Sequence, residues 1–389
     1  MQEYFTTELH GEKYRNEFWR FYEKKKYFIG TAITILCLIF LFGCSTPQQT
    51  NDEAEPQAAP AEVVETDEPV VSDGPTVIID QLGREVVIPE KIEKIAGLHI
   101  YGAKMIFAMG QKDKIGYQMA AGGADMAALA ELDDYYGSLP ESPSGSTHGS
   151  SINPETLIDL GVNLIFANAA AGAEEADIFT NAGIATVAIS GESFEEVYET
   201  AHLMGEIFGN PERADELIEF IEGNRSTVAS RVTGVTDDEK PVVMVSGSGG
   251  LYTAATGEMF QNLMVEMAGG VNAGKDLIGF WADISPEDII MWDPDYIFLA
   301  SFYGVDDVES VLNDPSIQTV KAIKNKDVYI FPSSLGWWDF PLPQSILGII
   351  WTGNTIHPDR FADVEMIQIA DEFYKYLYGY TYTELGGTL

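Results

Sequence analysis

Cysteine, histidine and basic residues are scarce in this chain, and each scarcity disfavours a class of site. Both cysteines, Cys37 and Cys44, lie near the N-terminus, so the rest of the chain can form neither a disulfide nor a cysteine-based metal site. With only five histidines in 389 residues, a three-histidine metal site is a minor alternative. Lys and Arg total 22 against 61 Asp and Glu, a net charge of −39, which argues against a nucleic-acid partner.

Common catalytic and nucleotide-binding motifs are also missing. The sequence contains neither Gly-x-Ser-x-Gly nor His-Glu-x-x-His. The stretch 246–250 is Ser-Gly-Ser-Gly-Gly, which lacks the Gly-Lys-Ser/Thr ending of a nucleotide loop, although its amides could cradle an oxyanion. We therefore expect a protein that is not an enzyme and that carries no cofactor.

The N-terminal apolar run resembles a lipoprotein signal. Tyr27–Phe42 is almost wholly apolar and follows the basic block Lys24–Lys26. A spanning helix needs about 20 apolar residues, and a shorter run with a basic flank is typical of a secretory signal. Leu41-Phe42-Gly43-Cys44 is similar to the end of a bacterial lipoprotein signal, which implies that Cys44 becomes the lipidated first residue. The alternative is an uncleaved signal anchor.

The next segment has the composition of a tether. Ser45–Pro75 contains no Lys, Arg or aromatic residue and is rich in Asp, Glu and Pro. Such a segment buries too little apolar surface to offset its ordering entropy, so we expect it to be disordered. The sequence thus predicts a signal over 1–43, and a lipidated cysteine with an acidic tether over 44–75. The folded part would be held outside the cytoplasm, at the outer face of the cytoplasmic membrane.

Short apolar runs alternate with helical patterns through the remaining residues, 76–389. This length is large for one core and favours two lobes. Val77–Asp80 and Glu85–Ile88 predict a hairpin. A helix is expected over Ala103–Met109. Strands that alternate with such helices are typical of parallel sheets in an α/β fold. The predicted strands are Lys94–Leu98, Leu164–Ala167, Ala185–Ile189, Val242–Val245, Tyr296–Leu299 and Val328–Phe331.

Two helices are expected between the halves. Ser193 and Glu196 form a capping-box pattern for a helix through Phe208. Asn210-Pro211 then starts a long helix with apolar residues on one face. We therefore predict an N-terminal lobe over 76–208, an interlobe helix over 209–232 and a C-terminal lobe over 233–389.

The sequence contains an internal repeat. Fifteen residues from Asn153, NPETLIDLGVNLIFA, align without a gap onto SPEDIIMWDPDYIFL from Ser285. Each copy has a capping residue, a proline, a glutamate, a short helix and a buried strand. The repeated Glu155 and Glu287 could simply stabilise helix dipoles. Their occurrence at one position in both halves favours a paired, outward-facing role.

These features together resemble a known family. Asp80–Arg84, both repeat copies, Gly269–Asn272 and Ala322–Tyr329 are similar to segments of the solute-binding proteins of bacterial importers for vitamin B12, ferric siderophores and haem. The resemblance implies two Rossmann-like lobes with parallel sheets, joined by one rigid helix, with the ligand in the cleft between them. It also implies that a glutamate on each lobe, here Glu155 and Glu287, docks onto arginines of a dimeric permease that works with an ATPase. We expect the binding protein to be a monomer.

Candidate cleft residues follow the ends of predicted strands, where open α/β sheets bind ligands. This rule selects His99, Tyr101, Ser248 and Tyr252, while Trp281 matches an aromatic ligand contact of the B12-binding members. The loop after the last strand adds Trp337, Trp338 and Asp339, although either tryptophan could instead seal the core. His148 lies ahead of the first repeat and either lines the cleft mouth or faces solvent. His202 and His357 are interpreted as structural.

These candidates are aromatic and neutral, and basic groups are scarce among them. The pattern favours a large, weakly charged ligand such as a hydroxamate siderophore or a corrinoid. Haem is a further option if His99 or Tyr101 ligates iron. One alternative is a molybdate or tungstate binder that uses the Ser-Gly loop. An alternative of another class is a surface receptor or a metal chelatase without a transport partner.

Overall fold

The computed structural model describes residues 76–117, 124–139, 152–191, 193–247, 249–300 and 307–389. The predicted signal and tether, with Cys44, lie outside these ranges, as do His148 and Ser248. Residues from Pro75 to Leu389 form one compact unit. None of the helices in the described ranges is long and apolar enough to cross a membrane.

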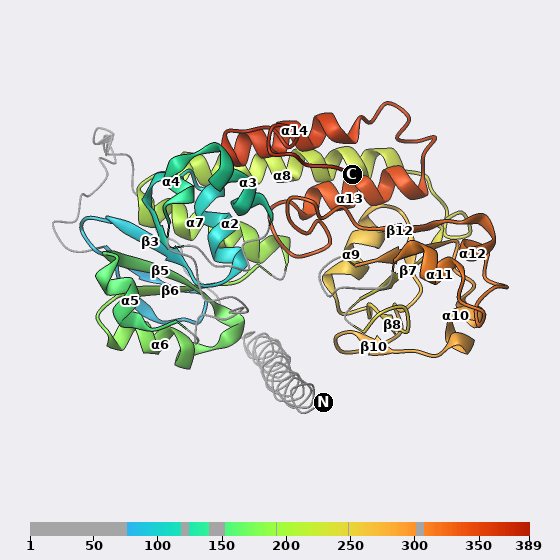
Figure 1. The fold of residues 1–389 in the computed structure, drawn as a ribbon, viewed down its shortest axis with the longest axis horizontal. Helices are drawn as coiled ribbons and strands as arrows, with labels where there is room; N and C mark the ends of the chain where they lie inside the picture. The colour runs from blue at the N-terminus through green and yellow to red at the C-terminus, as the bar shows by residue number, and fades with distance from the viewer. Residues whose placement is uncertain (1–75, 118–123, 140–151, 192, 248, 301–306) are drawn as a thin grey trace, which may run out of the picture. The chain divides into compact units, whose positions relative to one another are not determined.

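The first half of the unit contains a four-stranded parallel sheet in the order β4-β3-β5-β6. Its central strand β5 reads VNLIFAN and is largely buried on both faces, as expected where helices cover a parallel sheet on both sides. Helices surround this sheet on the left of Figure 1. The strands are β3 (Lys94–Gly97), β4 (Ile115–Tyr117), β5 (Val162–Asn168) and β6 (Ala185–Ile189).

The second half repeats this topology. Its sheet has the order β12-β11-β7-β9 and is also parallel throughout. In chain order, the first strand of each sheet pairs with the second and the third, and the third pairs with the fourth. The internal repeat is therefore a repeat of structure, and the predicted α/β class is confirmed. The strands are β7 (Val242–Ser246), β9 (Val271–Asn272), β11 (Tyr296–Leu299) and β12 (Val328–Ile330).

Further elements surround the sheets. The small antiparallel pairs are β1 (Val77–Ile79) with β2 (Glu85–Val87), and β8 (Thr253–Ala254) with β10 (Ala282–Asp283). The helices are α2 (Ile100–Ala108), η1 (Lys112–Lys114), α3 (Ala124–Leu132), α4 (Asp134–Gly137), α5 (Pro154–Asp159), η4 (Ala169–Ala171), α6 (Ala173–Asn181), α7 (Phe194–Phe208), α8 (Pro211–Val232), α9 (Phe260–Met267), α10 (Pro286–Trp292), α11 (Val308–Leu312), α12 (Lys321–Asn325), α13 (Ser345–Ile356) and α14 (Met366–Tyr378).

The hairpin β1–β2 is attached to the first sheet through Asp80. The Asp80 carboxylate pairs with Arg84 at 2.8 Å and accepts a 3.1 Å hydrogen bond from the Ala188 amide of β6. Its side chain has no solvent exposure, whereas that of Arg84 is 18% exposed. The predicted hairpin is therefore present, and a buried ion pair joins it to the sheet edge.

The long helix α8 begins where the sequence predicted. The Asn210 side chain caps it by accepting a bond from the Arg213 amide at 3.3 Å. In the preceding α7, Ser193 accepts a bond from the Glu196 amide at 3.2 Å, while the Glu196 carboxylate accepts one from the Ser190 hydroxyl at 2.6 Å. The buried face of α8 consists of Ala214, Leu217, Ile221 and Val228.

The last helix, α14, runs alongside α8 (Figure 1) and ends against the first lobe. Phe220 of α8 stacks on Tyr376 of α14, with ring centroids 5.0 Å apart and 3° between the planes. Tyr378 meets the edge of Phe107 in α2 at 4.9 Å. The Arg213 guanidinium lies 3.9 Å from the Tyr376 ring centroid, and its Nε donates to the Ala108 carbonyl at 2.8 Å. Two helices, α8 and α14, thus brace the first lobe.

We predict that Asp80→Ala lowers the free energy of unfolding by about 3–5 kcal/mol, because it leaves the Arg84 guanidinium without its buried partner. Urea denaturation followed by circular dichroism would measure the loss. The matched control is Glu85→Ala on the same hairpin, where the side chain is exposed and the midpoint should change little. Equal midpoints for both variants would contradict the role assigned to Asp80.

Candidate functional site

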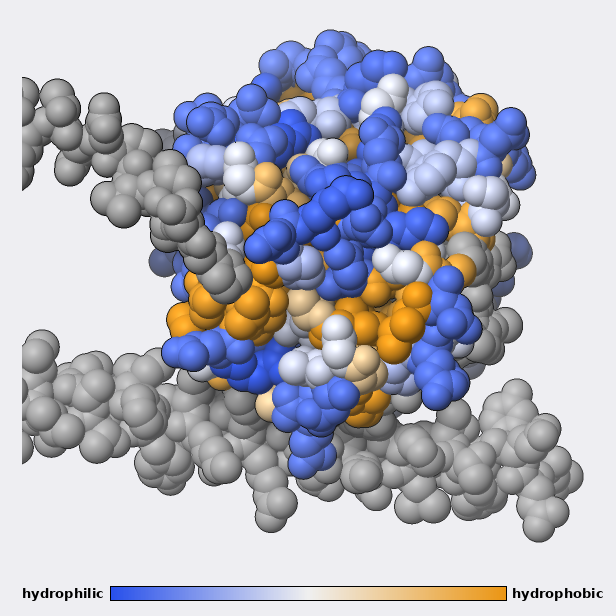
Figure 2. All heavy atoms as spheres, turned by 90° about the vertical axis from the view of Figure 1, so that its left-hand side faces the viewer, coloured by the Kyte–Doolittle hydropathy of each residue, from blue (hydrophilic) through white to orange (hydrophobic). Residues whose placement is uncertain are grey.

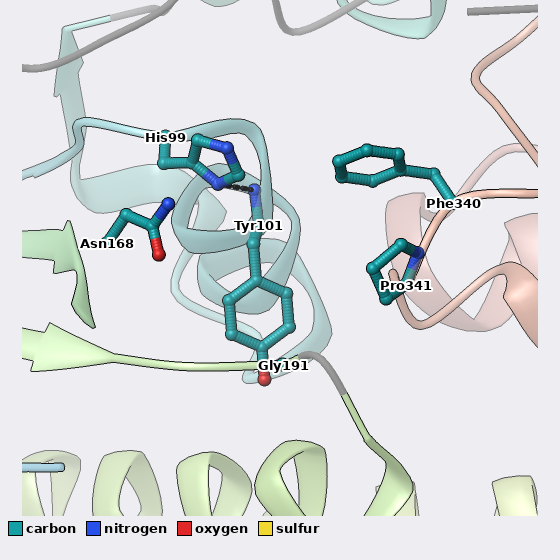
Figure 3. A pocket seen from close by; sticks show the side chains of 6 residues that line it. All are labelled: His99, Tyr101, Asn168, Gly191, Phe340 and Pro341. Atoms are coloured by element: carbon teal, nitrogen blue, oxygen red, sulfur yellow. Dashed lines mark hydrogen bonds between the residues drawn. The ribbon is translucent and has the colours of Figure 1, made fainter. Parts of the chain in front are cut away.

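A small pocket opens where residues of both lobes meet. His99, Tyr101, Asn168 and Gly191 line it from the first lobe, and Phe340 and Pro341 line it from the stretch after β12. In Figure 3 the first-lobe side chains lie on one side of the pocket and Phe340 and Pro341 on the other. The pocket is lined by residues of both lobes, and its use as a ligand site stays a prediction.

Three of the four first-lobe residues lie at the carboxyl ends of parallel strands, and Tyr101 lies in the first turn of α2. His99 follows β3, Asn168 is the last residue of β5, and Gly191 follows β6. Because these three strands are adjacent and parallel, their ends meet at one edge of the sheet. The strand-end rule selected His99 and Tyr101 from the sequence but was not applied to Asn168, whose strand was expected to end at Ala167.

His99 is also the N-cap of α2. Its Nδ1 accepts a hydrogen bond from the Tyr101 amide at 3.3 Å, and the helix starts at Ile100, three residues earlier than predicted. Because Nδ1 is the acceptor, the neutral imidazole carries its proton on Nε2. Ligating a metal through Nε2 would require the other tautomer and the loss of the cap.

Tyr101 forms the base of the pocket against Gly191. The tyrosine is 4% exposed, and its ring crosses the backbone of Gly191. A Cβ atom on Gly191 would lie 2.4 Å from two ring carbons, so only glycine permits this approach. The ring therefore presents mainly an apolar face to any ligand.

The loop that carries Gly191 is held by Gln81 of the hairpin turn. The Gln81 Oε1 accepts hydrogen bonds from the Ser190 amide at 2.6 Å and from the Thr200 hydroxyl at 2.9 Å. Its Nε2 donates to the Glu196 carbonyl at 3.3 Å. Gln81 thereby positions one wall of the pocket without belonging to it.

On the second lobe, Trp281 lies at the carboxyl end of β7. Its ring covers Gly247, where a Cβ atom would lie 2.3 Å from the indole. Trp281 is half-buried and meets its neighbour Phe280, which is 48% exposed, at a ring separation of 6.2 Å. Trp281 does not line the small pocket, and its contact with a ligand stays a prediction.

In the Ser-Gly loop after β7, the amides of Gly247 and Gly249 already have hydrogen-bond partners within the protein. The amides of Gly247 and Gly249 both donate to the Thr253 hydroxyl, each at 3.3 Å, and the Ser246 hydroxyl donates to the Gly250 carbonyl at 2.7 Å. These groups would have to exchange partners to bind an oxyanion. Ser248 itself lies outside the described residues.

Tyr252 does not line the pocket. Its hydroxyl donates to the Asp314 carboxylate at 2.7 Å, and its ring packs on a core cluster of the second lobe that includes Leu251 and Ile289. Burial raises the pKa of Asp314, but the bonds from Tyr252 and Ser316 outweigh this effect and hold that pKa below its usual value. Tyr252 is therefore not brought together with His99 and Tyr101.

The three candidates after the last strand take different places. Trp338 is fully buried and packs on Tyr382 at a ring separation of 5.6 Å, so it seals the core, which is the alternative considered above. Asp339 is 2% exposed, and its carbonyl accepts a 2.7 Å bond from Gln261. Trp337 is half-buried and braces the pocket residue Phe340 at 5.9 Å. The pocket residues Phe340 and Pro341 were missed because they lie just beyond the aromatic cluster.

No three-ligand metal cluster forms in the described ranges: no group of three His, Cys, Asp or Glu there could hold an ion. Among the histidines taken as structural, His357 contacts the Gly269 carbonyl at 3.1 Å, and His202 lies 3.9 Å from Asp215 on the exposed side of α7. Neither histidine lines the pocket.

The two repeated glutamates are both exposed near the starts of their short helices. Asn153 caps α5 by accepting a bond from the Glu155 amide at 3.0 Å. Ser285 caps α10 in a full capping box with Asp288. The carboxylates of Glu155 and Glu287 both reach solvent. Their predicted contact with a permease is a question for the proposed function.

Comparisons with known proteins agree with this architecture. Residues 102–335 match the family described as periplasmic binding protein. The molybdate-binding protein MolA of Haemophilus influenzae is 26% identical over 334 residues, which are 79% of this chain and 92% of MolA. The uncharacterized ABC transporter substrate-binding lipoprotein YvrC of Bacillus subtilis is 24% identical over 346 residues, covering 87% of this chain and 100% of YvrC.

A solved structure shows the same fold. The periplasmic solute binding protein from Veillonella parvula matches with a TM-score of 0.69 and 24% identity, over 81% of this chain and 97% of that one. The family match spans most of both lobes and includes both copies of the internal repeat. The chain belongs to the periplasmic binding protein family and is the substrate-binding component of an ABC importer, a binding protein and not an enzyme.

Proposed function

We propose that the protein captures a weakly charged metal chelate, a hydroxamate siderophore or a corrinoid, between its lobes and delivers it to an ABC permease dimer. The observation that carries this proposal is the lining of the pocket. His99 and Asn168 supply polar groups, and Tyr101, Phe340 and Pro341 supply apolar surface. Such a lining suits contact with a ligand surface that has few polar groups and little net charge.

Charge also argues against a strongly anionic ligand. None of the residues that line the described pocket is Lys or Arg. Burying several negative charges without cationic partners costs free energy, so we expect a ferric tris-catecholate to bind weakly in this pocket. Haem is less favoured than the neutral chelates, because His99 uses Nδ1 to cap α2 and presents a proton on Nε2.

Molybdate or tungstate is the second candidate, favoured by the 26% identity to MolA. The donors for an oxyanion would come from the first lobe, where His99 Nε2 and the Asn168 amide line the pocket. The Ser-Gly loop supports this candidate less than the sequence suggested, because its Gly247 and Gly249 amides are bonded to Thr253.

The proposed location combines the family with the N-terminal signal. A lipidated Cys44 followed by the acidic stretch 45–75 would hold the two lobes near the outer face of the cytoplasmic membrane. Glu155 and Glu287, exposed on equivalent helices, would then contact arginines of the permease. The binding protein is proposed to act as a monomer.

The ligand proposal predicts micromolar or tighter binding of a ferric hydroxamate siderophore or of cobalamin, measured by tryptophan fluorescence and calorimetry. His99→Ala should weaken that binding by about tenfold, because it removes a donor in the pocket. The matched control is His202→Ala, where the side chain is 60% exposed on α7 and binding should be unchanged. Tight binding of molybdate, with neither chelate bound, would replace the ligand class and leave the importer role intact.

The anchor proposal predicts that Cys44→Ser blocks lipidation. The variant should lack diacylglycerol by mass spectrometry, and a part of it should leave the membrane fraction or retain the signal. A Cys44→Ser protein that still carries lipid and fractionates like the wild type would show that the anchor lies elsewhere.

The docking proposal predicts that Glu155→Ala with Glu287→Ala abolishes uptake by the host while ligand affinity stays within a few-fold. Exposed ion pairs contribute about 0–1 kcal/mol to folding, so the melting temperature should change little. The control pair is Glu212→Ala with Glu219→Ala, exposed on α8. A large loss of ligand affinity in the first pair would move these glutamates to the ligand site.

A further inference from the structure

Each copy of the internal repeat exposes an isoleucine three residues after its glutamate. Ile158 on α5 is 46% exposed, and Ile290 on α10 is 42% exposed. On the side of the first lobe that Figure 2 shows, the surface is mostly hydrophilic, and apolar residues gather there in separate areas. A single exposed isoleucine needs no explanation, but two at one aligned position do.

The fold itself does not need these two side chains. Leu157 and Ile289, the residues just before them, are both fully buried and seat α5 and α10 on their sheets. Each helix has that one buried residue and no other. The exposed isoleucine therefore adds little to the packing of its own lobe.

The isoleucine shares a helix face with the glutamate. Residues three apart on a helix are neighbours, with about 5–6 Å between their Cβ atoms. Glu155 with Ile158, and Glu287 with Ile290, thus form two small surfaces, each with one carboxylate and one aliphatic side chain.

These two surfaces are equivalent by topology. The helix α5 precedes β5, and α10 precedes β11, which are the corresponding third strands of the two sheets. Figure 1 shows α5 and α10 on different lobes, both away from α8. A pair of equivalent surfaces fits a partner that itself presents the same site twice, as a symmetric dimer does.

We propose that Ile158 and Ile290 are the apolar anchors of the permease interface, each inserting into an apolar socket beside the cationic group that receives the neighbouring glutamate. This inference rests on the proposed docking role of Glu155 and Glu287. The occupant is the permease dimer, whose cationic groups complement a chain of net charge −39. The carboxylates orient the complex, and the isoleucines supply desolvated contact area.

The test uses the full lipoprotein and its permease–ATPase complex in lipid nanodiscs, with binding followed by biolayer interferometry and ATPase stimulation. Ile158→Ser with Ile290→Ser should weaken binding by at least about tenfold, because an apolar anchor is lost on each side. The control pair is Leu132→Ser with Ile367→Ser, whose side chains are 49% and 40% exposed on α3 and α14. This pair should bind within about twofold of the wild type.

The outcomes separate this inference from the docking proposal. If the Glu155→Ala, Glu287→Ala pair loses binding while the isoleucine pair binds like the wild type, the anchor assignment is overturned and the docking proposal stands. If neither pair of variants differs from the wild type in binding, both the anchor assignment and the docking proposal are overturned. A loss in the isoleucine pair alone, with melting temperature and ligand binding retained, supports the anchors and reassigns the glutamates.

Discussion

The packing of α8 between helices of both halves is the constraint on which the pocket depends. Its fully buried residues Leu217 and Ile221 belong to the large core that also includes residues of α7, α9 and α13. The helix α14 adds a second brace through the stack of Phe220 on Tyr376. Because the pocket takes His99 from one lobe and Phe340 from the other, it exists only while these helices hold the two sheets together.

The turn Asp80–Arg84 is far from Gly191 in the sequence, but it positions the pocket loop that carries this glycine. Asp80 fastens the hairpin to β6, and Gln81 then binds the backbone just after that strand. The loop is thereby placed so that Gly191 lies under the ring of Tyr101. A motif that contributes no pocket side chain thus determines the shape of one wall.

The capping role of His99 gives the pocket its chemical character. A histidine that follows a strand could ligate a metal, donate a proton or bind a carboxylate. The bond from the Tyr101 amide to Nδ1 selects the tautomer with its proton on Nε2, which is suited to an acceptor oxygen on a ligand. His99 and Asn168 line the pocket beside the apolar surface of Phe340 and Pro341.

Periodicity, capping residues and the repeat were sufficient, from the sequence alone, to predict the α/β class, the hairpin, six of the eight strands of the two main sheets and the start of α8. These features depend on residues close together in the chain. The direction of each loop side chain, in contrast, does not depend on residues close together in the chain. Trp338 is buried because Tyr382, far along the chain, packs on it, and Tyr252 is held against the core of the second lobe by its hydrogen bond to Asp314. Only tertiary contacts of this kind decide which strand-end residues face the cleft, since neighbouring loop residues offer similar chemistry and differ only in what the folded chain places beside them.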